Sequence, residues 1–237
     1  QTRARSEQIV NLLQLAKQEV RDIHDGIAGT LSIGTVASSG AAFLPERIRL
    51  YQTRYPLVNF QFWEGDTAMV SDLVQHGVAE LGIARLKDHD DRYERLIFPA
   101  EPFVAAFPER LADGATGGIG LAELARYPLM VNRRNAPMFF DACRKLDVHP
   151  RVICEGNDVR TLLAWADSGV GVAVVSRSAQ HLIKSERLVY REILASDLFL
   201  QRSLFWLKQR ELSMAAKHFI ELVTVEETAQ LERAENG

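Results

Sequence analysis

The sequence has few cysteines and no long apolar run. Its two cysteines, Cys143 and Cys154, lack the C-x-x-C spacing of a zinc site, and its six histidines form no metal-ligand pair. No apolar stretch approaches the roughly 20 residues of a membrane span. The first two dozen residues carry charges where a signal peptide needs an apolar core. We therefore expect no metal and no membrane contact, a cytoplasmic location, and two reduced thiols in the core.

An excess of positive charge is also missing. Lysine and arginine number 28 and aspartate and glutamate 31, which gives a formal net charge of −3. DNA-binding domains carry a basic surface that neutralises phosphates, so direct DNA binding by this chain is not expected. Apolar residues make up 47% and charged residues 25%, as is typical of globular proteins. The 237 residues suffice for one large domain or two smaller lobes.

No residue pattern is typical of catalysis. An enzyme needs a nucleophile with a base, a carboxylate pair or a cofactor-binding loop. Gly169 and Gly171 are too closely spaced for a dinucleotide-binding loop and open a strand instead of closing one. His76 precedes Gly77 at a predicted helix end, where a histidine interacts with the helix dipole. We expect neither an enzyme nor a cofactor.

A predicted strand with buried Leu31, Ile33 and Val36 runs directly into a helix start. Ser38 and Ser39 are N-cap candidates for that helix. In an open α/β sheet such a turn lies at the carboxyl end of the strand, where helix N–H groups and the helix dipole favour a carboxylate or another anion. The alternative is an ordinary βα turn whose serines only cap.

The next segments predict a βαβαβ order. Residues 58–62 alternate as a strand, Asp66 or Thr67 caps a helix that ends at Gly77, and residues 79–84 form a buried strand. Since the carboxyl ends of parallel strands share one sheet edge, polar residues at these ends are expected to converge. Those residues are Ser38, Ser39, Glu64 and Arg85. Phe62 and Trp63 are expected in the core of the sheet.

The second half predicts a similar set. Pro99 and Pro102 prevent residues 96–107 from being a central strand throughout, so we expect an extended crossover to a second lobe. The expected elements are strands over 128–131, 151–154, 170–175 and 203–208, and helices over 138–146, 158–168 and 212–225. Asn132 and Arg133 end one strand, and Asn157 follows another in a small turn before a capped helix. Arg133 and Arg134 either bind an anion or face solvent.

Residues 1–25 predict a helix with a narrow apolar stripe over residues 9–23. The stripe fits a partner helix in a self-associated protein. The alternative is an N-terminal helix folded back on its own domain.

Several stretches resemble the effector-binding part of LysR-type transcriptional regulators. They are Gly-Thr-Leu-Ser-Ile-Gly at 29–34, Leu-Pro at 44–45, Glu-Gly-Asp-Thr at 64–67, Glu-Leu-Gly-Ile-Ala at 80–84 and Ala-Asp-Ser-Gly-Val-Gly-Val-Ala-Val-Val at 166–175. In sequence order they cover nearly the whole chain. Where many relatives have a proline after the last stretch, this chain has Ser176.

The resemblance implies an α/β fold of two Rossmann-like lobes of the periplasmic-binding-protein type II kind, preceded by a long N-terminal helix. It implies a linker helix over 1–26, one lobe over 27–98 and 200–237, and a second over 99–199. It also implies dimers or tetramers, and DNA binding only through a winged helix-turn-helix outside this sequence. The residues expected to contact a small-molecule effector, a carboxylate, in the cleft between the lobes are Ser38, Ser39, Glu64, Arg85, Asn132, Arg133, Asn157 and Val175.

Two other protein classes share a two-lobed fold. A solute-binding protein of a transporter would need a secretion signal and would not need an amphipathic linker helix. A two-lobed enzyme would need catalytic residues that the sequence does not show. A winged helix-turn-helix upstream in the full-length gene would identify the regulator.

Overall fold

The computed structural model describes residues 17, 20–21, 24–86, 90–112, 114 and 117–235, without the side chains of 230–235. Backbone contacts divide the chain into two compact units. Unit 1 comprises Gln1–Val36, Leu44–Leu96 and Ser203–Gly237, and unit 2 comprises Ala37–Phe43 and Ile97–Arg202. The predicted helix over 1–25 lies almost entirely outside the described residues.

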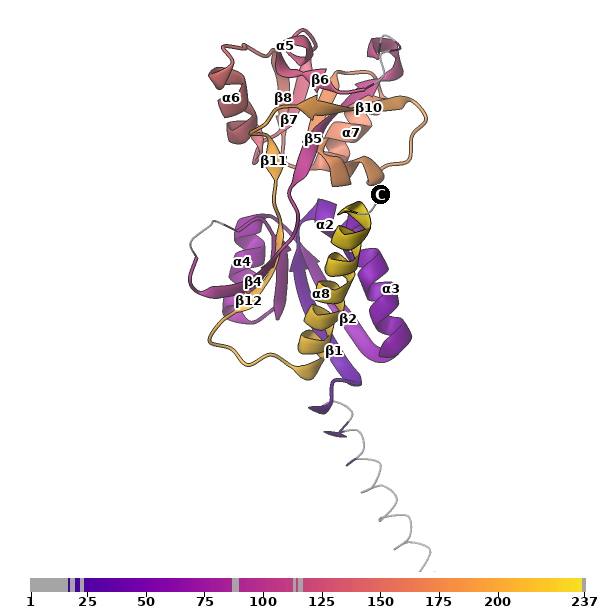
Figure 1. The fold of residues 1–237 in the computed structure, drawn as a ribbon, viewed down its shortest axis with the longest axis vertical. Coiled ribbons are helices and arrows are strands. Elements are labelled where there is room, and N and C mark those ends of the chain that lie inside the picture. Colours follow the sequence, from indigo (N-terminus) through magenta and orange to yellow (C-terminus); the bar gives the residue numbers. More distant parts are fainter. Residues whose placement is uncertain are drawn as a thin grey trace, which may run out of the picture. The chain divides into compact units, whose positions relative to one another are not determined.

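Unit 1 contains a five-stranded sheet of order β2-β1-β3-β12-β4 (Figure 1). Its strands are β1 (Ala28–Thr35), β2 (Leu57–Glu64), β3 (Leu81–Ala84), β4 (Tyr93–Ile97) and β12 (Ser203–Leu207). Strand β1 runs parallel to β2 and β3, which confirms the βαβαβ prediction. Strand β12 returns antiparallel to β3, so the sheet is mixed and not wholly parallel.

Helices cover both faces of this sheet. They are α3 (Leu44–Arg54), α4 (Thr67–His76) and α8 (Met214–Glu235). Gly34 faces α4, because a Cβ at Gly34 would lie 3.3 Å from Val70. Side chains alternate along a strand, so the buried Ile33 points to the other face, where α8 packs on β1 and α3 packs on α8. The buried Tyr51 joins these two helices by donating its hydroxyl to the Ala215 carbonyl at 2.9 Å.

The helix ends of unit 1 test the predicted boundaries. Asp66 caps α4 as expected, accepting from the Met69 N–H at 2.8 Å, and Gly77 ends it with φ 71°. The helix predicted to follow Ser38 and Ser39 is in fact two helices, α2 (Ala37–Ala42) and α3. Helix α8 continues to Glu235, ten residues beyond the predicted end at 225, and just past that predicted end Glu227 pairs with Arg47 of α3.

Unit 2 contains a mixed sheet of order β6-β10-β5-β9-β7-β8, with β11 paired to β5. Its strands are β5 (Glu101–Pro108), β6 (Ile119–Gly120), β7 (Leu129–Asn132), β8 (Val152–Gly156), β9 (Val172–Ser176), β10 (Leu188–Leu194) and β11 (Phe199–Leu200). Strands β7, β8 and β9 are parallel, whereas β5 is antiparallel to β9 and β10. The chain crosses from unit 1 to unit 2 at the start of the predicted crossover over residues 96–107, but the prediction missed β5, which is a central strand. Pro102 is tolerated because the pairing of β5 with β9 begins only at Phe103, so no hydrogen bond to β9 is needed from Pro102.

Two apolar cores lie on the two faces of the β5 strand. Phe103 and Phe107 pack with residues of α5 (Leu121–Leu124) and α6 (Ala136–Lys145). Val104 and Ala106 pack with residues of α7 (Val159–Asp167) and the 3₁₀ helix η2 (Arg177–His181). Another 3₁₀ helix, η1 (Glu109–Leu111), follows β5. Unit 2 is therefore a sheet covered on both faces, as a Rossmann-like lobe requires.

Helix α2 follows a strand of unit 1 but packs within unit 2. It lies against η2, and Phe43, just after it, contacts the Phe98 ring at a centroid distance of 4.6 Å. This grouping differs from the expected lobe over residues 27–98, which included α2. In the part of the chain that the structure describes, no helix has the length and hydropathy needed to cross a membrane.

Candidate functional site

The carboxyl edge of the unit 1 sheet carries two of the predicted site residues. Thr35 ends β1 and lies opposite Glu64 on one side and Ile83 on the other. Glu64 is the last residue of β2, and Arg85 directly follows β3; both side chains are exposed. The structure therefore places Glu64 and Arg85 on either side of the end of β1. Their contact with an effector stays a prediction.

The carboxyl edge of the unit 2 sheet carries three more. Strands β7 and β8 are parallel neighbours, with Asn132 opposite Gly156. The Asn132 side chain donates to the Asn157 carbonyl at 3.0 Å and accepts from the Arg134 N–H at 3.1 Å. Since Asn132 is only 4% exposed, both ends of its amide are used inside the protein. Asn132 thus holds the two strand ends together.

Arg133 has a different environment from its neighbour Asn132. Its backbone N–H donates to the Gly156 carbonyl at 2.8 Å, which fixes its place at the edge. Its side chain is exposed, with one guanidinium nitrogen 3.5 Å from the Glu155 carbonyl, a long contact. Helix α6 begins three residues later, and its N-cap residue Asn135 makes no side-chain capping bond. An exposed guanidinium in the turn that leads to the uncapped start of a helix suits an anion.

The start of α7 is capped by the side chain of its own N-cap residue, Asp158. The Asp158 carboxylate accepts from the Arg160 N–H at 2.8 Å and pairs with the Arg160 guanidinium at 3.1 Å. These interactions with Arg160 lower the pKa of Asp158. The predicted capped helix after Asn157 is confirmed, and Asn157 itself is exposed.

Ser38 and Ser39 are not N-cap residues, which corrects the prediction. Helix α2 begins at Ala37, so both serines lie in its first turn, and the preceding Val36 has no side-chain oxygen for capping. A first-turn N–H has no partner within its own helix. Ser38 is partly exposed, whereas Ser39 is 1% exposed.

Val175 is the one apolar residue among those predicted. It lies one position before the end of β9, opposite Val104, and its side chain is fully buried in the core beside α7. Sequence patterns alone missed a polar group near α2, in which Glu101 contacts Ser178 and Arg202. An isolated acidic residue before a proline gives no signal for such a role.

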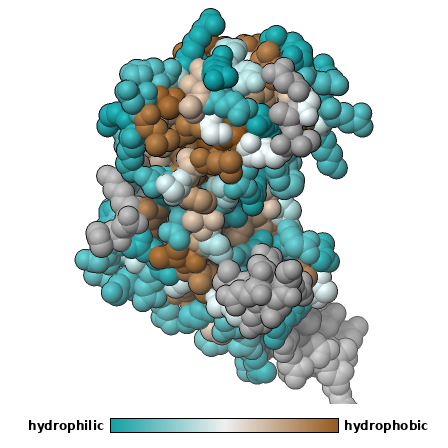
Figure 2. Space-filling view, turned by 45° about the horizontal axis from the view of Figure 1, so that its top comes forward, coloured by the Kyte–Doolittle hydropathy of each residue, from teal (hydrophilic) through white to brown (hydrophobic). Residues whose placement is uncertain are grey.

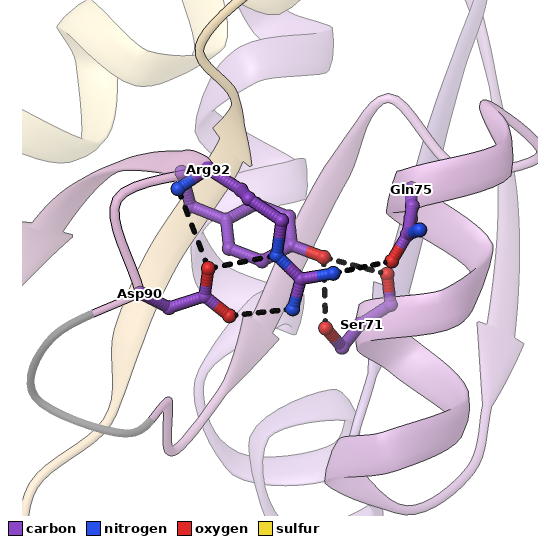
Figure 3. A network of polar contacts seen from close by, with 5 residues as sticks. Ser71, Gln75, Asp90 and Arg92 are labelled. Atoms are coloured by element: carbon purple, nitrogen blue, oxygen red, sulfur yellow. Dashed lines mark hydrogen bonds and ion pairs between the residues drawn. The ribbon is translucent and has the colours of Figure 1, made fainter.

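Charged clusters elsewhere have structural explanations. In unit 1, Figure 3 shows the Arg92 guanidinium between Asp90 and Gln75, with bonds of 2.7–2.8 Å to each. The Tyr93 hydroxyl lies 2.8 Å from the Ser71 hydroxyl in the same network. Together these bonds hold the start of β4 against α4. Arg92 lowers the pKa of Asp90, so this carboxylate is ionised at neutral pH and keeps its bonds to Arg92.

The two cysteines differ in burial. Cys143 is buried, as expected, and burial raises the pKa of its thiol to about 11, which leaves it protonated and unreactive. Cys154 is partly buried. Among the side chains that the structure describes, no group of three or more histidine, cysteine, aspartate or glutamate residues could hold a metal ion.

Comparison with known proteins matches the chain to one family. The family model described as the LysR substrate binding domain matches residues 24–226. The HTH-type transcriptional regulator IlvR of Caulobacter vibrioides is 30% identical over 222 residues, covering 88% of this chain and 72% of that protein.

Solved structures show the same fold. The LysR family regulator CbnR has a TM-score of 0.80 at 18% identity and covers 93% of this chain and 77% of its own. The effector-binding domain of QuiR was solved in complex with shikimate. It has a TM-score of 0.73 at 16% identity, and the match covers 85% of this chain and 98% of the QuiR chain. With a family match over most of its length and the periplasmic-binding-protein type II architecture, the chain belongs to the LysR substrate-binding domain family.

Proposed function

We propose that this chain is the effector-sensing part of a bacterial transcriptional regulator, acting in the cytoplasm and not as an enzyme. The observation that carries the proposal is the family match over residues 24–226. The similar proteins reported above are named transcriptional regulators. In this proposal, a winged helix-turn-helix of the whole regulator binds DNA, and this chain makes that binding depend on a small molecule.

The proposed effector is a small organic acid. Arg133 offers an exposed guanidinium next to the uncapped start of α6, and this arrangement supplies both charge and N–H donors to a carboxylate. Shikimate, the ligand of the similar QuiR domain, is itself a carboxylate. Other exposed groups that we propose for effector contact are Ser38 and the first-turn amides of α2, Asn157, Glu64 and Arg85. Asn132 and Val175 support this site from within the core.

Sensing requires that the effector bind one conformation better than another. A ligand shifts a conformational equilibrium only by the difference between its affinities for the two states. The proposed response is a change in the paired regulator that alters how the DNA-binding helices are held. A solute-binding protein of a transporter is the alternative on the same fold, and regulation of an operator by the full-length protein would exclude it.

A thermal-shift screen with matched pairs tests the effector class. The probes are sodium benzoate and sodium shikimate together with other monocarboxylates, each compared with its neutral amide. An acid present at about a hundredfold its dissociation constant should add about 2.7 kcal/mol to the unfolding free energy, whereas its amide should add little. Equal stabilisation by an acid and its amide would show that a carboxylate is not what the site recognises.

A further inference from the structure

One carboxylate in unit 2 joins three separate segments. Glu101, the first residue of β5, accepts from the Ser178 N–H at 2.7 Å and from the Ser178 hydroxyl at 2.9 Å. The same carboxylate pairs with Arg202 at 3.1 Å. The side chains of Glu101 and Arg202 are only 14% and 21% exposed, so water competes weakly for these bonds. Glu101 therefore fixes the turn after β9 to the residue at which the chain leaves unit 2.

The partners of Glu101 belong to segments that pack against α2 and against Phe43, the residue that follows it. Ser178 belongs to η2, and η2 is the element against which α2 packs. Arg202 lies over the Phe43 ring, 5.0 Å from its centroid, and Phe98 also contacts that ring. Helix α2 has only six residues, which is too short to be stable without such packing.

We propose that Glu101 is a positioning residue for α2. Through Ser178 it holds η2 under the helix, and through Arg202 it holds the cation that covers Phe43. The effect on α2 is independent of any ligand, whereas its consequence for effector affinity rests on the proposed function.

Hydrogen exchange on the whole chain, followed by NMR at single amides, tests this role. The reporters are the Phe43 N–H, which donates to the Ser39 carbonyl at 3.0 Å, and the Ser178 N–H. Glu101→Ala should accelerate exchange at both by roughly tenfold or more, because it removes bonds to a charged group. Glu101→Gln keeps one acceptor oxygen and should recover part of the protection. Amides at the centres of β7 and β9 should keep their rates.

Glu192→Ala is the matched control. Glu192 pairs with Arg177 of the same η2 turn, but the two side chains are 41% and 48% exposed. Exposed pairs contribute little, so exchange at Phe43 should stay within about twofold. If Glu101→Ala fails to fold, Ser178→Ala removes one of the bonds and should still accelerate Phe43 exchange severalfold.

Three outcomes would overturn the proposal. The first is an unchanged exchange rate at the Phe43 amide in both Glu101→Ala and Ser178→Ala. The others are an equal acceleration of exchange at all amides of unit 2, and an equal acceleration at Phe43 in the Glu192→Ala control. In the full-length regulator, Glu101→Gln should raise the half-saturating effector concentration with operator affinity unchanged. If the exchange result holds and the effector response does not change, Glu101 positions α2 and the proposed role of α2 in effector binding is wrong.

Discussion

Adjacent residues at the end of β7 have opposite roles. Asn132 is buried with its amide satisfied at both ends, whereas Arg133 presents an exposed guanidinium. The sequence predicted that both lie at a strand end, but it could not show which side chain is buried and which is exposed. The difference depends on the Asn157 carbonyl, which is brought close by the pairing of two strands about 25 residues apart.

Asn132→Ala and Arg133→Ala should therefore differ in their effect on stability. Asn132→Ala removes two hydrogen bonds made by a buried side chain, to the Asn157 carbonyl and from the Arg134 N–H, which should lower the unfolding free energy by about 1–3 kcal/mol. Arg133→Ala should change it by less than about 0.5 kcal/mol, as is usual for surface positions. Urea unfolding of the two variants measures both. A similar loss in each variant would contradict the different roles that we assign.

At the scale of elements, the sequence predicted correctly those strands and helix ends that depend only on neighbouring residues. Strand β1, the Asp66 cap and the Gly77 end of α4 follow from residue pattern and turn chemistry. Strand β10 was missed, and β5 was taken for a crossover, because both are fixed by antiparallel pairing between segments about 80 residues apart. The break between α2 and α3 was missed as well, since it depends on the packing of Phe43 against Phe98 and Arg202.

The N-terminus of α7 predicts a pH-dependent contribution to stability. Arg160 lowers the pKa of Asp158 in the folded state, so the ionised cap stabilises the fold at pH values above the unfolded aspartate value of about 3.9. That stability is lost as the pH falls through the lowered pKa. Because the Asp158 side chain is 42% exposed, screening limits the effect to about 0.5 kcal/mol.

Asp158→Asn keeps a capping oxygen but removes the charge, and so isolates this contribution. The variant should be slightly less stable than the original at pH 7, and the difference should disappear under acidic conditions. Chemical unfolding at a series of pH values measures it. A difference that persists at the acidic end would show that the charge of Asp158 is not its cause.

At the scale of the whole molecule, we expect self-association through an edge strand of the unit 1 sheet. Strand β2 is at an edge of its sheet, and its Leu57 and Phe62 side chains are each 60% exposed. This corrects the expectation that Phe62 lies in the sheet core; Trp63, on the other face, packs partly in the core as expected. Hydrophobic patches interrupt the hydrophilic surface in Figure 2. An exposed edge strand with large apolar side chains is a common pairing surface.

Phe62→Glu should weaken this pairing. We expect the original chain to form at least a dimer at micromolar concentration, since closed symmetric pairs are the commonest homo-oligomers. A buried charge on β2 would oppose the contact, so light scattering should show a shift toward the monomer mass. Glu94→Gln on β4, at the opposite edge of the same sheet, serves as the control. An unchanged mass distribution for Phe62→Glu would place the interface elsewhere.

The central claim is that the first turn of α2 contributes to effector binding in a transcriptional regulator. The most direct measurement is the response of the full-length protein to its effector when Ser38 and Ser39 are both replaced by alanine. Loss of a hydrogen bond to a charged group costs about 1.5–3 kcal/mol, so the half-saturating effector concentration should rise at least about tenfold. Ser38→Ala alone should account for most of this, since Ser39 is buried.

Ser213→Ala provides the control, because Ser213 caps the start of α8 by accepting from the Ala216 N–H at 3.1 Å and lies outside the proposed site. It should lower the melting temperature without changing the effector response. Operator affinity in the absence of effector should be the same in all variants. The account predicts a weakened response confined to the α2 serines; a normal response from the double variant, with the protein folded and bound to its operator, would contradict it.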